Sequence, residues 1–309
     1  MMHTILGAGG PVSNALAREL QQKNENVRLV SRREIKASGH TSWAGADLKD
    51  YRQLLQAVQG SDIIYMCAGL RYDKNVWAAE WPLIMQNLID VTKATNARLI
   101  FFDNVYMYGH VPVTMTEETP YNPGSKKGEV RARIAETLMQ EVRSGNIRAT
   151  IARAADFYGA ESLNSFYDSM VLTKYARKQK AMWLGNPDSK HTFTYVQDAG
   201  KAVYLLGQHP EADNQIWHVP SAPALSGREF INLAANVFQT KPDFTRVNKL
   251  MLQTLGLFTK TIGETAELYY QYQYDYLFSS EKFEKAFKMK PTRYQDGIEQ
   301  LSQTLFRQK

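Results

Sequence analysis

The glycine-rich segment at residues 7–13 constrains the fold more than any other part of the sequence. It reads Gly-Ala-Gly-Gly-Pro-Val-Ser, follows the apolar residues 4–6 and precedes apolar residues with helical spacing. Glycines here permit a tight turn and a close approach of the backbone to a pyrophosphate, and the next helix start offers free N–H groups. The spacing is G-x-x-G-x-x-G with Ser13 third, and it predicts a dinucleotide-binding turn; the alternative is a turn that binds nothing. The residues expected at the dinucleotide are Gly7, Gly9, Gly10, Pro11 and Val12.

The first half of the chain alternates between two hydrophobic periods. Strand-like apolar runs stand at residues 4–6, 27–30, 62–67, 98–102 and 148–152, and helical spacing stands at 12–23, 51–59, 81–95 and 129–143. Such alternation predicts an α/β fold with a doubly wound parallel sheet covered on both faces. The alternation of strand and helix patterns becomes less regular after residue 155. This change predicts a dinucleotide-binding domain over residues 1–155. A smaller α/β substrate-binding domain is expected over residues 156–309, interleaved with the first.

Composition narrows the class of protein. The chain has 309 residues, a net charge of +6 and one cysteine, which excludes a disulfide framework within the chain and a cysteine-based zinc cluster. No apolar run approaches the roughly 20 residues of a membrane helix, and the amino terminus does not resemble a signal peptide. Lysine and arginine form no long block, which disfavours a nucleic-acid platform. We therefore expect a cytoplasmic protein with a small-molecule substrate, no metal, and no membrane or nucleic-acid partner.

The end of the second predicted strand indicates which dinucleotide binds. An acidic residue usually stands there when the ligand is NAD, but this chain reads Val-Ser-Arg-Arg at residues 30–33. The guanidinium groups of Arg32 and Arg33 suit a 2′-phosphate, because arginine binds phosphate through two parallel hydrogen bonds. The pattern favours NADP over NAD, which stays possible; the alternative is a solvated strand end.

Other strand ends supply further cofactor candidates. Asp47, followed by Leu48, suits the adenine amino group. The small residues of Cys67-Ala68-Gly69 would let the backbone approach the cofactor, and Cys67 itself is expected to behave as a buried small apolar residue.

The order of these motifs resembles the extended branch of the short-chain dehydrogenase/reductase superfamily, the NAD-dependent epimerases and dehydratases. The resemblance covers nearly the whole chain, and it implies a Rossmann domain with a small carboxyl-terminal substrate domain. It also implies a returning segment at about residues 190–210, a strand followed by a helix, and often a dimer, so a monomer or homodimer is expected. Its landmarks are the residue 7–13 turn, Asp47-Leu48, residues 67–69, Asn87, and the segments 102–109, 153–159, 191–199 and 291–298.

The chain departs from this family where the family does its chemistry. Family enzymes carry Ser or Thr four residues before the tyrosine of a Tyr-Gly pair, and here that position is Asn104. The family's Tyr-x-x-x-Lys pair, counted about 24 residues onward, falls on Gly128 and Ala132. The sequence therefore resembles atypical members that keep the cofactor fold without the usual catalytic residues.

Replacement candidates lie in the same region. The candidate catalytic residues are Asn104, Tyr106 and Tyr121. Asn104 can orient a substrate carbonyl by a hydrogen bond but does not titrate. Asp103 and Lys126 are candidates for contacting substrate, Lys127 is an alternative partner cation, and His191 could reach the cleft. The resemblance places Asp156, Tyr158 and Tyr195 at substrate-facing positions.

Two functions fit these observations. One is an NAD(P)-dependent oxidoreductase or epimerase-like enzyme acting on a sugar or another small carbonyl or hydroxyl compound. The other is a non-catalytic NADP(H)-binding sensor or regulatory protein. Loss of the Tyr-x-x-x-Lys pair favours the sensor, and retention of the substrate half favours the enzyme.

Replacing Arg32 with alanine tests the cofactor preference. Charge-assisted hydrogen bonds contribute roughly 1.5–3 kcal/mol, so Arg32→Ala should weaken NADPH about ten- to a hundredfold and NADH far less. Calorimetric titration of both dinucleotides at one salt concentration measures this. Equal losses for the two would contradict the assignment.

Overall fold

The computed structural model describes residues 1–159, 165, 167–256 and 260–307. The strands are β1 (Met2–Leu6), β2 (Asn26–Ser31), β3 (Thr41–Gly45), β4 (Ile63–Met66), β5 (Arg98–Asp103), β6 (Ala149–Arg153), β7 (Asp156–Tyr158), β8 (Ala181–Leu184), β9 (Lys190–His191), β10 (Phe193–Tyr195), β11 (Ile216–His218), β12 (Leu225–Ser226) and β13 (Phe244–Val247). The α-helices are α1 (Pro11–Gln22), α2 (Tyr51–Val58), α3 (Lys74–Thr95), α4 (Lys126–Arg143), α5 (Thr173–Ala176), α6 (Val196–Gln208), α7 (Gly227–Val237), α8 (Lys249–Gly256), α9 (Lys260–Thr265), α10 (Tyr270–Gln273), α11 (Glu281–Phe287) and α12 (Tyr294–Arg307). Shorter turns are η1 (Tyr106–Tyr108), η2 (Asp168–Leu172), η3 (Pro210–Ala212) and η4 (Ala266–Leu268).

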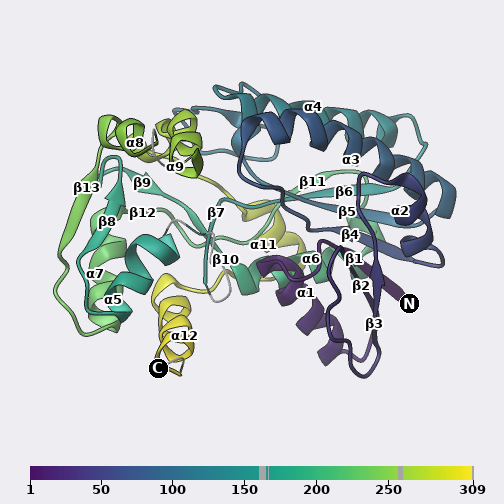
Figure 1. Ribbon diagram of the computed structural model, residues 1–309, viewed down its shortest axis with the longest axis horizontal. Coiled ribbons are helices and arrows are strands. Elements are labelled where there is room, and N and C mark those ends of the chain that lie inside the picture. Colours follow the sequence, from purple (N-terminus) through teal and green to yellow (C-terminus); the bar gives the residue numbers. More distant parts are fainter. Residues whose placement is uncertain (160–164, 166, 257–259, 308–309) are drawn as a thin grey trace.

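A seven-stranded parallel sheet organises the amino-terminal half. Its order is β11-β6-β5-β4-β1-β2-β3, and every pairing is parallel. Helices α2, α3 and α4 cover one face of the sheet, and α1, α6 and α11 cover the other (Figure 1). A separate apolar core lies between the sheet and the helices on each face. The expected doubly wound α/β fold is confirmed. Crossovers of this kind bring the carboxyl ends of all the strands to one edge.

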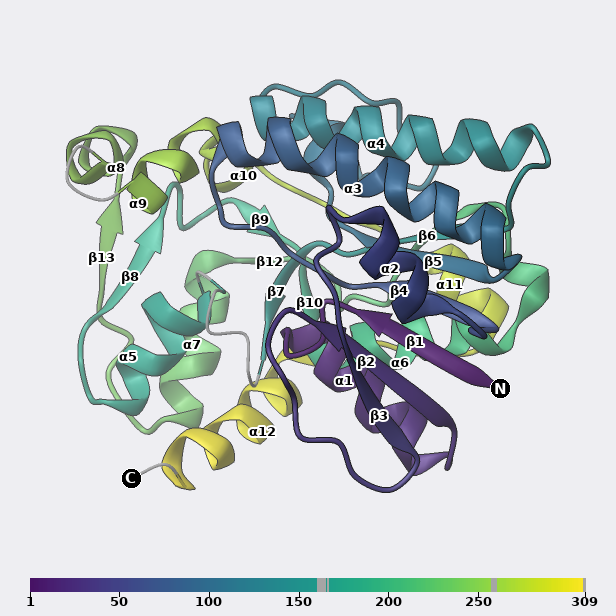
Figure 2. The same cartoon turned by 45° about the vertical axis from the view of Figure 1, so that its right-hand side comes forward.

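A smaller unit lies beside this edge (Figure 2). It consists of three two-stranded sheets with α5, α7 and α12 around an aromatic core. The expected return of the chain to the first half takes a different form. Strand β10 pairs with β7 of the smaller unit, and the segment that joins the main sheet is β11, beyond residue 210. Helix α6 falls within the expected return and packs on α1.

Two local features differ from or add to the sequence predictions. Strand β3 was expected only through its end before Asp47, because its five residues include only two apolar side chains, Trp43 and Ala44. Helix α3 begins at Lys74 rather than at residue 81, since Asp73 caps it by accepting hydrogen bonds from two backbone N–H groups. Pro82 resembles a helix start but lies inside α3.

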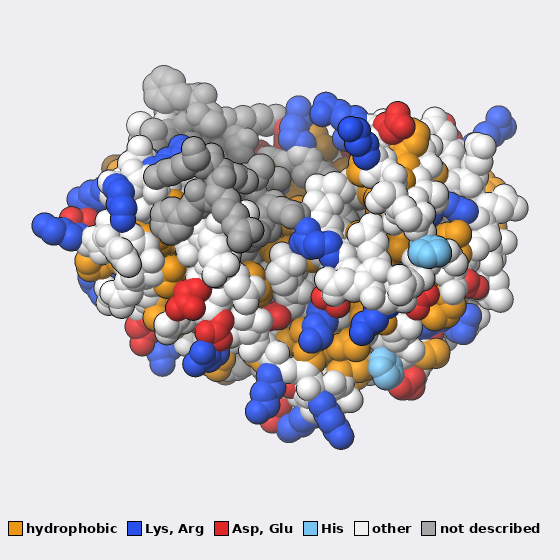
Figure 3. All heavy atoms as spheres, turned by 90° about the horizontal axis from the view of Figure 1, so that it is seen from below, with side chains coloured by type: hydrophobic (Ala, Val, Ile, Leu, Met, Phe, Trp, Pro, Cys, Tyr) orange, Lys and Arg blue, Asp and Glu red, His pale blue; other side chains and the backbone are white. Residues whose placement is uncertain are grey.

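The charged surface is mixed. On the face drawn in Figure 3, Lys and Arg side chains are scattered among Asp and Glu rather than gathered into one patch. Within the described residues, no helix combines the length and the apolar character needed to cross a bilayer.

A buried histidine joins the main sheet to the carboxyl-terminal segment. His218 Nε2 lies 2.7 Å from the Tyr108 hydroxyl, and Nδ1 lies 2.9 Å from the carbonyl oxygen of Ser279. Its ring stacks on Phe278 at 4.0 Å. The carbonyl oxygen requires a proton on Nδ1, so the tyrosine donates to Nε2 and the ring is neutral. Burial and the nearby Arg153 lower the pKa of His218 to about 3.

This histidine predicts a loss of stability in mild acid. The unfolded chain binds a proton near pH 6.5 and the folded chain only near pH 3, so stability falls as the pH drops from 6.5 toward 3. Between pH 7 and 5 the contribution of His218 to this loss is about 2 kcal/mol. Urea denaturation at the two pH values should give a smaller difference for His218→Gln than for wild type. His40→Gln, at an exposed position, should keep the wild-type difference; an unchanged difference in His218→Gln would refute the assignment.

Candidate functional site

The glycine turn between β1 and α1 has the backbone geometry that its sequence predicts. Gly7 and Gly9 adopt φ angles of +85° and +94°, which L side chains rarely adopt. A Cβ on Gly7 would lie 2.3 Å from the Ala68 Cα, so the two strand ends touch through their backbones. Gly10 precedes α1, and no side chain caps this helix start. The first N–H groups of α1 are therefore left for a ligand, as a pyrophosphate requires.

The two arginines after β2 are exposed. Within the part of the chain that the structure describes, neither guanidinium forms an ion pair or a hydrogen bond, and Arg33 takes part only through its carbonyl oxygen, which accepts from Ser31 Oγ. Trp43 Nε1 donates to the same hydroxyl at 3.1 Å and fixes this strand end beside β3. Both guanidinium groups thus stay available to an anion.

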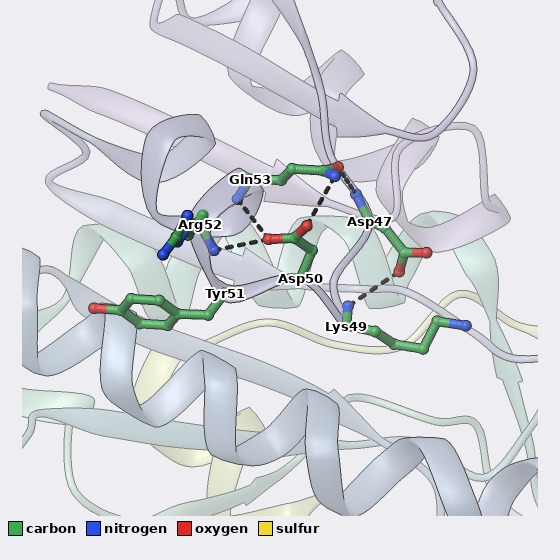
Figure 4. A pocket seen from close by; sticks show the side chains of 6 residues that line it. All are labelled: Asp47, Lys49, Asp50, Tyr51, Arg52 and Gln53. Carbon is green, nitrogen blue, oxygen red and sulfur yellow. Dashed lines mark hydrogen bonds between the residues drawn. The ribbon is translucent and has the colours of Figure 1, made fainter.

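The segment between β3 and α2 forms an open pocket (Figure 4), lined by Asp47, Lys49, Asp50, Tyr51, Arg52 and Gln53. The Asp47 carboxylate accepts from the Lys49 backbone N–H at 3.0 Å, and Gln53 Oε1 accepts from the Asp47 N–H at 3.0 Å. Asn87 Nδ2 donates to the Leu48 carbonyl oxygen at 3.0 Å, so Asn87 anchors this loop to α3. The adenine contact expected of Asp47 stays a prediction.

Residues 67–69 follow β4 directly. Burial raises the pKa of the Cys67 thiol to about 12, so this sulfur is a thiol at neutral pH and a poor nucleophile. A Cβ on Gly69 would meet open space. The predicted role of this segment as a small-residue wall next to a cofactor stays a prediction.

Position 128, where the sequence count places the family's catalytic tyrosine, has no room for a side chain in this backbone. A Cβ on Gly128 would lie 2.5 Å from the Tyr106 carbonyl oxygen and 3.0 Å from Pro123 Cβ. Ala132, at the lysine position one turn later, is buried among apolar residues. Position 128 is therefore closed by backbone packing as well as lacking the tyrosine.

The three candidate catalytic residues make two separate sets of contacts. Asn104 Oδ1 accepts from the Tyr106 N–H at 3.0 Å and shapes the turn after β5. The Tyr106 ring stacks on Trp77 at 6.1 Å, and its hydroxyl hydrogen-bonds with Tyr72. Tyr121 instead hydrogen-bonds with Arg153. The structure thus separates Tyr121 from the Tyr72–Tyr106 pair.

Asp103 forms a buried ion network rather than a free base. Its carboxylate pairs with Arg131 of α4, and Arg153 of β6 lies 3.5 Å away. The expected contact of Asp103 with a substrate has no support in this arrangement.

Tyr106 belongs to a buried aromatic and polar group that we call the tyrosine site. Its members meet at the junction of the main sheet edge with the smaller unit. Tyr272 hydrogen-bonds with Asp156, and the rings of Tyr270 and Tyr276 lie 6.2 Å apart. The tyrosine site consists of Tyr72, Tyr106, Asp156, His191, Tyr270, Gln271, Tyr272 and Tyr276.

His191 and Asp156 form the polar end of the tyrosine site. His191 Nε2 lies 3.3 Å from Asp156 Oδ2, and His191 Nδ1 lies 3.2 Å from the Gln271 carbonyl oxygen. The imidazole stacks with Phe193, Tyr276 and Tyr272, at ring-centroid distances of 4.7, 5.6 and 5.9 Å. His191 thus joins the predicted Asp156 at one place, as the sequence allowed.

Two predicted substrate residues lie elsewhere. Tyr158 and Tyr195 are buried in the aromatic core of the smaller unit, with ring centroids 5.2 Å apart. The Tyr195 hydroxyl donates to Gln300 of α12 at 2.9 Å. Asp156 and Tyr158 are two residues apart on β7, so their side chains leave the strand on the same face. Tyr158 nevertheless packs into the aromatic core of the smaller unit. Both tyrosines are packing residues here.

The two lysines at the start of α4 differ in environment. Lys126 is exposed, whereas Lys127 is fully buried. Lys127 Nζ lies 2.6 Å from Glu264 and 2.6 Å from Glu267, and 4.5 Å above the Tyr72 ring. The expected substrate contact of Lys126 stays a prediction, and Lys127 is committed to an ion triad.

Sequence reasoning missed Tyr72, Gln271 and the two glutamates. Gln271 meets His191 across 80 residues, and Glu264 and Glu267 meet Lys127 across 137 and 140. Tyr72 follows β4 without any motif, so no local spacing marks these residues. The only available signal was Lys127, an unusual charge on the buried side of a helix. Among the described residues, no cluster of His, Cys, Asp and Glu is arranged to hold a metal ion.

Solved structures share this architecture along the whole chain. MoeE5 in complex with UDP-glucose and NAD gives a TM-score of 0.80 at 16% identity, covering 100% of this chain and 99% of that one. UDP-glucuronic acid 4-epimerase from Bacillus cereus with NAD gives 0.81 at 13%, covering 100% and 99%. DesIV, a dTDP-glucose 4,6-dehydratase from Streptomyces venezuelae, gives 0.81 at 15% as a double mutant, covering 99% and 97%. Identities this low show the fold alone.

Sequence comparison gives more distant, partial matches and one family. The uncharacterised protein y4nL of Sinorhizobium fredii is 23% identical over 198 residues, 62% of this chain and 54% of that protein. The dTDP-glucose 4,6-dehydratase of Mycolicibacterium smegmatis is 23% identical over 190 residues, 54% and 57%. The chain thus spans about half the length of these curated relatives. The model of the NAD dependent epimerase/dehydratase family matches residues 3–219, well over half of the chain. The chain belongs to the NAD dependent epimerase/dehydratase family.

Proposed function

We propose that this protein is an NAD(P)-dependent enzyme that transfers hydride to or from a sugar or another small carbonyl or hydroxyl compound. The observation that carries the proposal is the pairing of two features. The glycine turn keeps its uncapped helix start, and a buried polar site persists at the same sheet edge although the Tyr-x-x-x-Lys pair is absent. A protein that only sensed cofactor would have no need for the second feature.

The residues present fit a nicotinamide dinucleotide. Gly7 and Gly9 give the turn its backbone shape, and the first turn of α1 would hold the pyrophosphate. Arg32 and Arg33, exposed at the end of β2, support NADP through a 2′-phosphate contact. Structures of similar fold contain NAD, which supports the dinucleotide class. When bound, the nicotinamide supplies the hydride chemistry.

Tyr106 is the proposed proton donor. Burial raises the pKa of Tyr106 well above its ordinary value, so the hydroxyl stays protonated at neutral pH. A protonated hydroxyl donates a hydrogen bond to a carbonyl oxygen and stabilises the charge that develops there. Its partner Tyr72 holds the hydroxyl in place, and Trp77 stacks on the ring.

The alternative is a non-catalytic NADP(H)-binding sensor or regulatory protein. Closure of position 128 favours it, since the family's own acid/base residue has no room in this backbone. The two functions share the cofactor site and differ only in hydride transfer.

Isotope exchange at nicotinamide C4 in the presence of sugars and ketones separates the two. The enzyme should move label to at least one carbonyl class, and Tyr106→Phe should reduce the rate about a hundredfold or more, since general acid catalysis contributes roughly 10²–10⁴. Cofactor affinity, measured by calorimetry, should be retained in this variant.

Tyr274→Phe is the matched control, because Tyr274 is 52% exposed and outside the tyrosine site. Tight cofactor binding without transfer to any carbonyl class would support the sensor. Binding of neither dinucleotide by folded, cofactor-free protein would refute both functions.

A further inference from the structure

The end of strand β2 is joined directly to the glycine turn. The Val30 carbonyl oxygen accepts hydrogen bonds from the backbone N–H groups of Gly7 and Ala8, each at 3.0 Å. Arg32 and Arg33 follow two and three residues later, and both are exposed. In dinucleotide-binding folds of this kind, the end of the second strand meets the ribose hydroxyl or the 2′-phosphate of the adenosine. The two guanidinium groups thus extend from backbone that is fixed beside the expected pyrophosphate site.

The connection between β2 and β3, residues 32–40, lies on the surface. The structure describes all of these residues, and each of them except Ile35 is exposed. Ile35 packs beside the glycine turn, where its Cδ1 would lie 3.6 Å from a Cβ on Gly9. An exposed segment is ordered by the few contacts that it makes. The positions of Arg32 and Arg33 therefore depend on what holds the first residues of this connection.

Two consecutive hydrogen bonds hold those first residues. Trp43 Nε1 donates to Ser31 Oγ at 3.1 Å, and Ser31 Oγ donates to the Arg33 carbonyl oxygen at 2.5 Å. An indole N–H only donates, so the hydroxyl accepts from the indole and gives its own proton to the carbonyl oxygen. Hydrogen bonds in such a chain polarise and strengthen one another. We call the side chains of Ser31 and Trp43, together with the Arg33 carbonyl oxygen, the strand-end clamp.

The neighbouring strand leaves room for the indole ring of the strand-end clamp. Ser31 of β2 is paired with Gly45 of β3, and the Trp43 side chain leaves β3 on the same face as position 45. A Cβ on Gly45 would lie 3.1 Å from Trp43 Cη2 and 3.3 Å from Cζ2, closer than side chains ordinarily pack. The absence of a side chain at position 45 thus lets the ring lie over this position and reach Ser31.

We propose that Trp43 and Ser31 are positioning residues for cofactor selectivity. Through the Arg33 carbonyl oxygen they fix the backbone from which the two guanidinium groups reach the 2′-phosphate of NADP(H). The proposal rests on the proposed function, because it concerns the dinucleotide that this function uses. Holding the arginines in place before the ligand arrives reduces the ordering cost of binding. NADH has a hydroxyl group instead of the 2′-phosphate, so this reduction favours NADPH alone.

Ligands with and without the 2′-phosphate test the proposal. Trp43→Phe keeps an aromatic ring and removes the N–H donor. Calorimetry should show that this variant binds NADPH and adenosine 2′,5′-bisphosphate roughly three- to tenfold more weakly, the effect of one lost hydrogen bond. The affinities for NADH and adenosine 5′-monophosphate should stay within about twofold of wild type, because these ligands lack the phosphate that the arginines bind. General loss of structure would instead weaken all four ligands equally.

Ser42→Ala is the matched control for Ser31→Ala. Ser42 lies next to Trp43 and on the opposite face of β3, and its Oγ donates to the Val27 carbonyl oxygen at 3.4 Å. Ser31→Ala should reproduce the loss of NADPH affinity without a loss for NADH. Ser42→Ala should leave the affinities for both dinucleotides unchanged.

A double-mutant cycle tests whether the strand-end clamp acts through the arginines. In a protein that already carries Arg32→Ala and Arg33→Ala, Trp43→Phe should cause no further loss of NADPH affinity. The effects of groups that act together are not additive, and this protein has no guanidinium group left to position. A further loss equal to that in the wild-type background would contradict the proposal.

Three other outcomes would also overturn it. One is an equal loss of NADPH and NADH affinity in Trp43→Phe. The second is a Trp43→Phe variant that prefers NADPH as strongly as the wild type does. The third is a wild-type protein that binds NADPH no more tightly than NADH. In all three, hydride transfer with either dinucleotide would leave the proposed function standing. Folded, cofactor-free protein that binds neither dinucleotide would refute the proposed function and this inference together.

Discussion

The carboxylate of Asp103 is the interaction on which the rest of the site depends. It ends strand β5 and meets Arg131 from α4 and Arg153 from β6, with all three side chains nearly or fully buried. Removing one partner of such a network leaves a buried charge unpaired, which typically costs about 3–5 kcal/mol. Arg153 extends the network to Tyr121 and Tyr108. The strand ends, the first turns of α4 and the loop at residue 121 are therefore positioned by one group of charges.

This network also lies where α4 comes close to the turn after β5. Arg131 lies on the segment of α4 between Gly128 and Ala132, and it brings α4 close to the turn after β5. The approach puts the Tyr106 carbonyl oxygen where a side chain at position 128 would stand. The same turn carries the Tyr106 ring to Trp77 and its hydroxyl to Tyr72. The closed space at position 128 and the placement of the Tyr106 ring thus belong to one backbone arrangement.

A second group of charges closes the site from the carboxyl-terminal side. Glu264 accepts from the Lys74 N–H that begins α3, and Glu267 accepts from the Lys126 N–H that begins α4. Carboxylates at helix starts are favoured by the helix dipole. Lys127 joins both glutamates, so η4 and the end of α9 lie across the amino ends of two helices (Figure 2). The two carboxylates therefore compensate the positive charge of Lys127.

The sequence by itself determined the parallel α/β architecture and the glycine turn, because these depend on local spacing and on residue identity. It also marked Tyr106 and Asp156. It did not reveal that Tyr158 and Tyr195 pack in a core, or that Tyr72, His191 and Gln271 share a site. Lys127 meets Glu264 across 137 residues, and His191 meets Gln271 across 80. Pairings over such separations leave no periodic signal, so only the tertiary structure decided which charged side chains pair and which distant residues lie together.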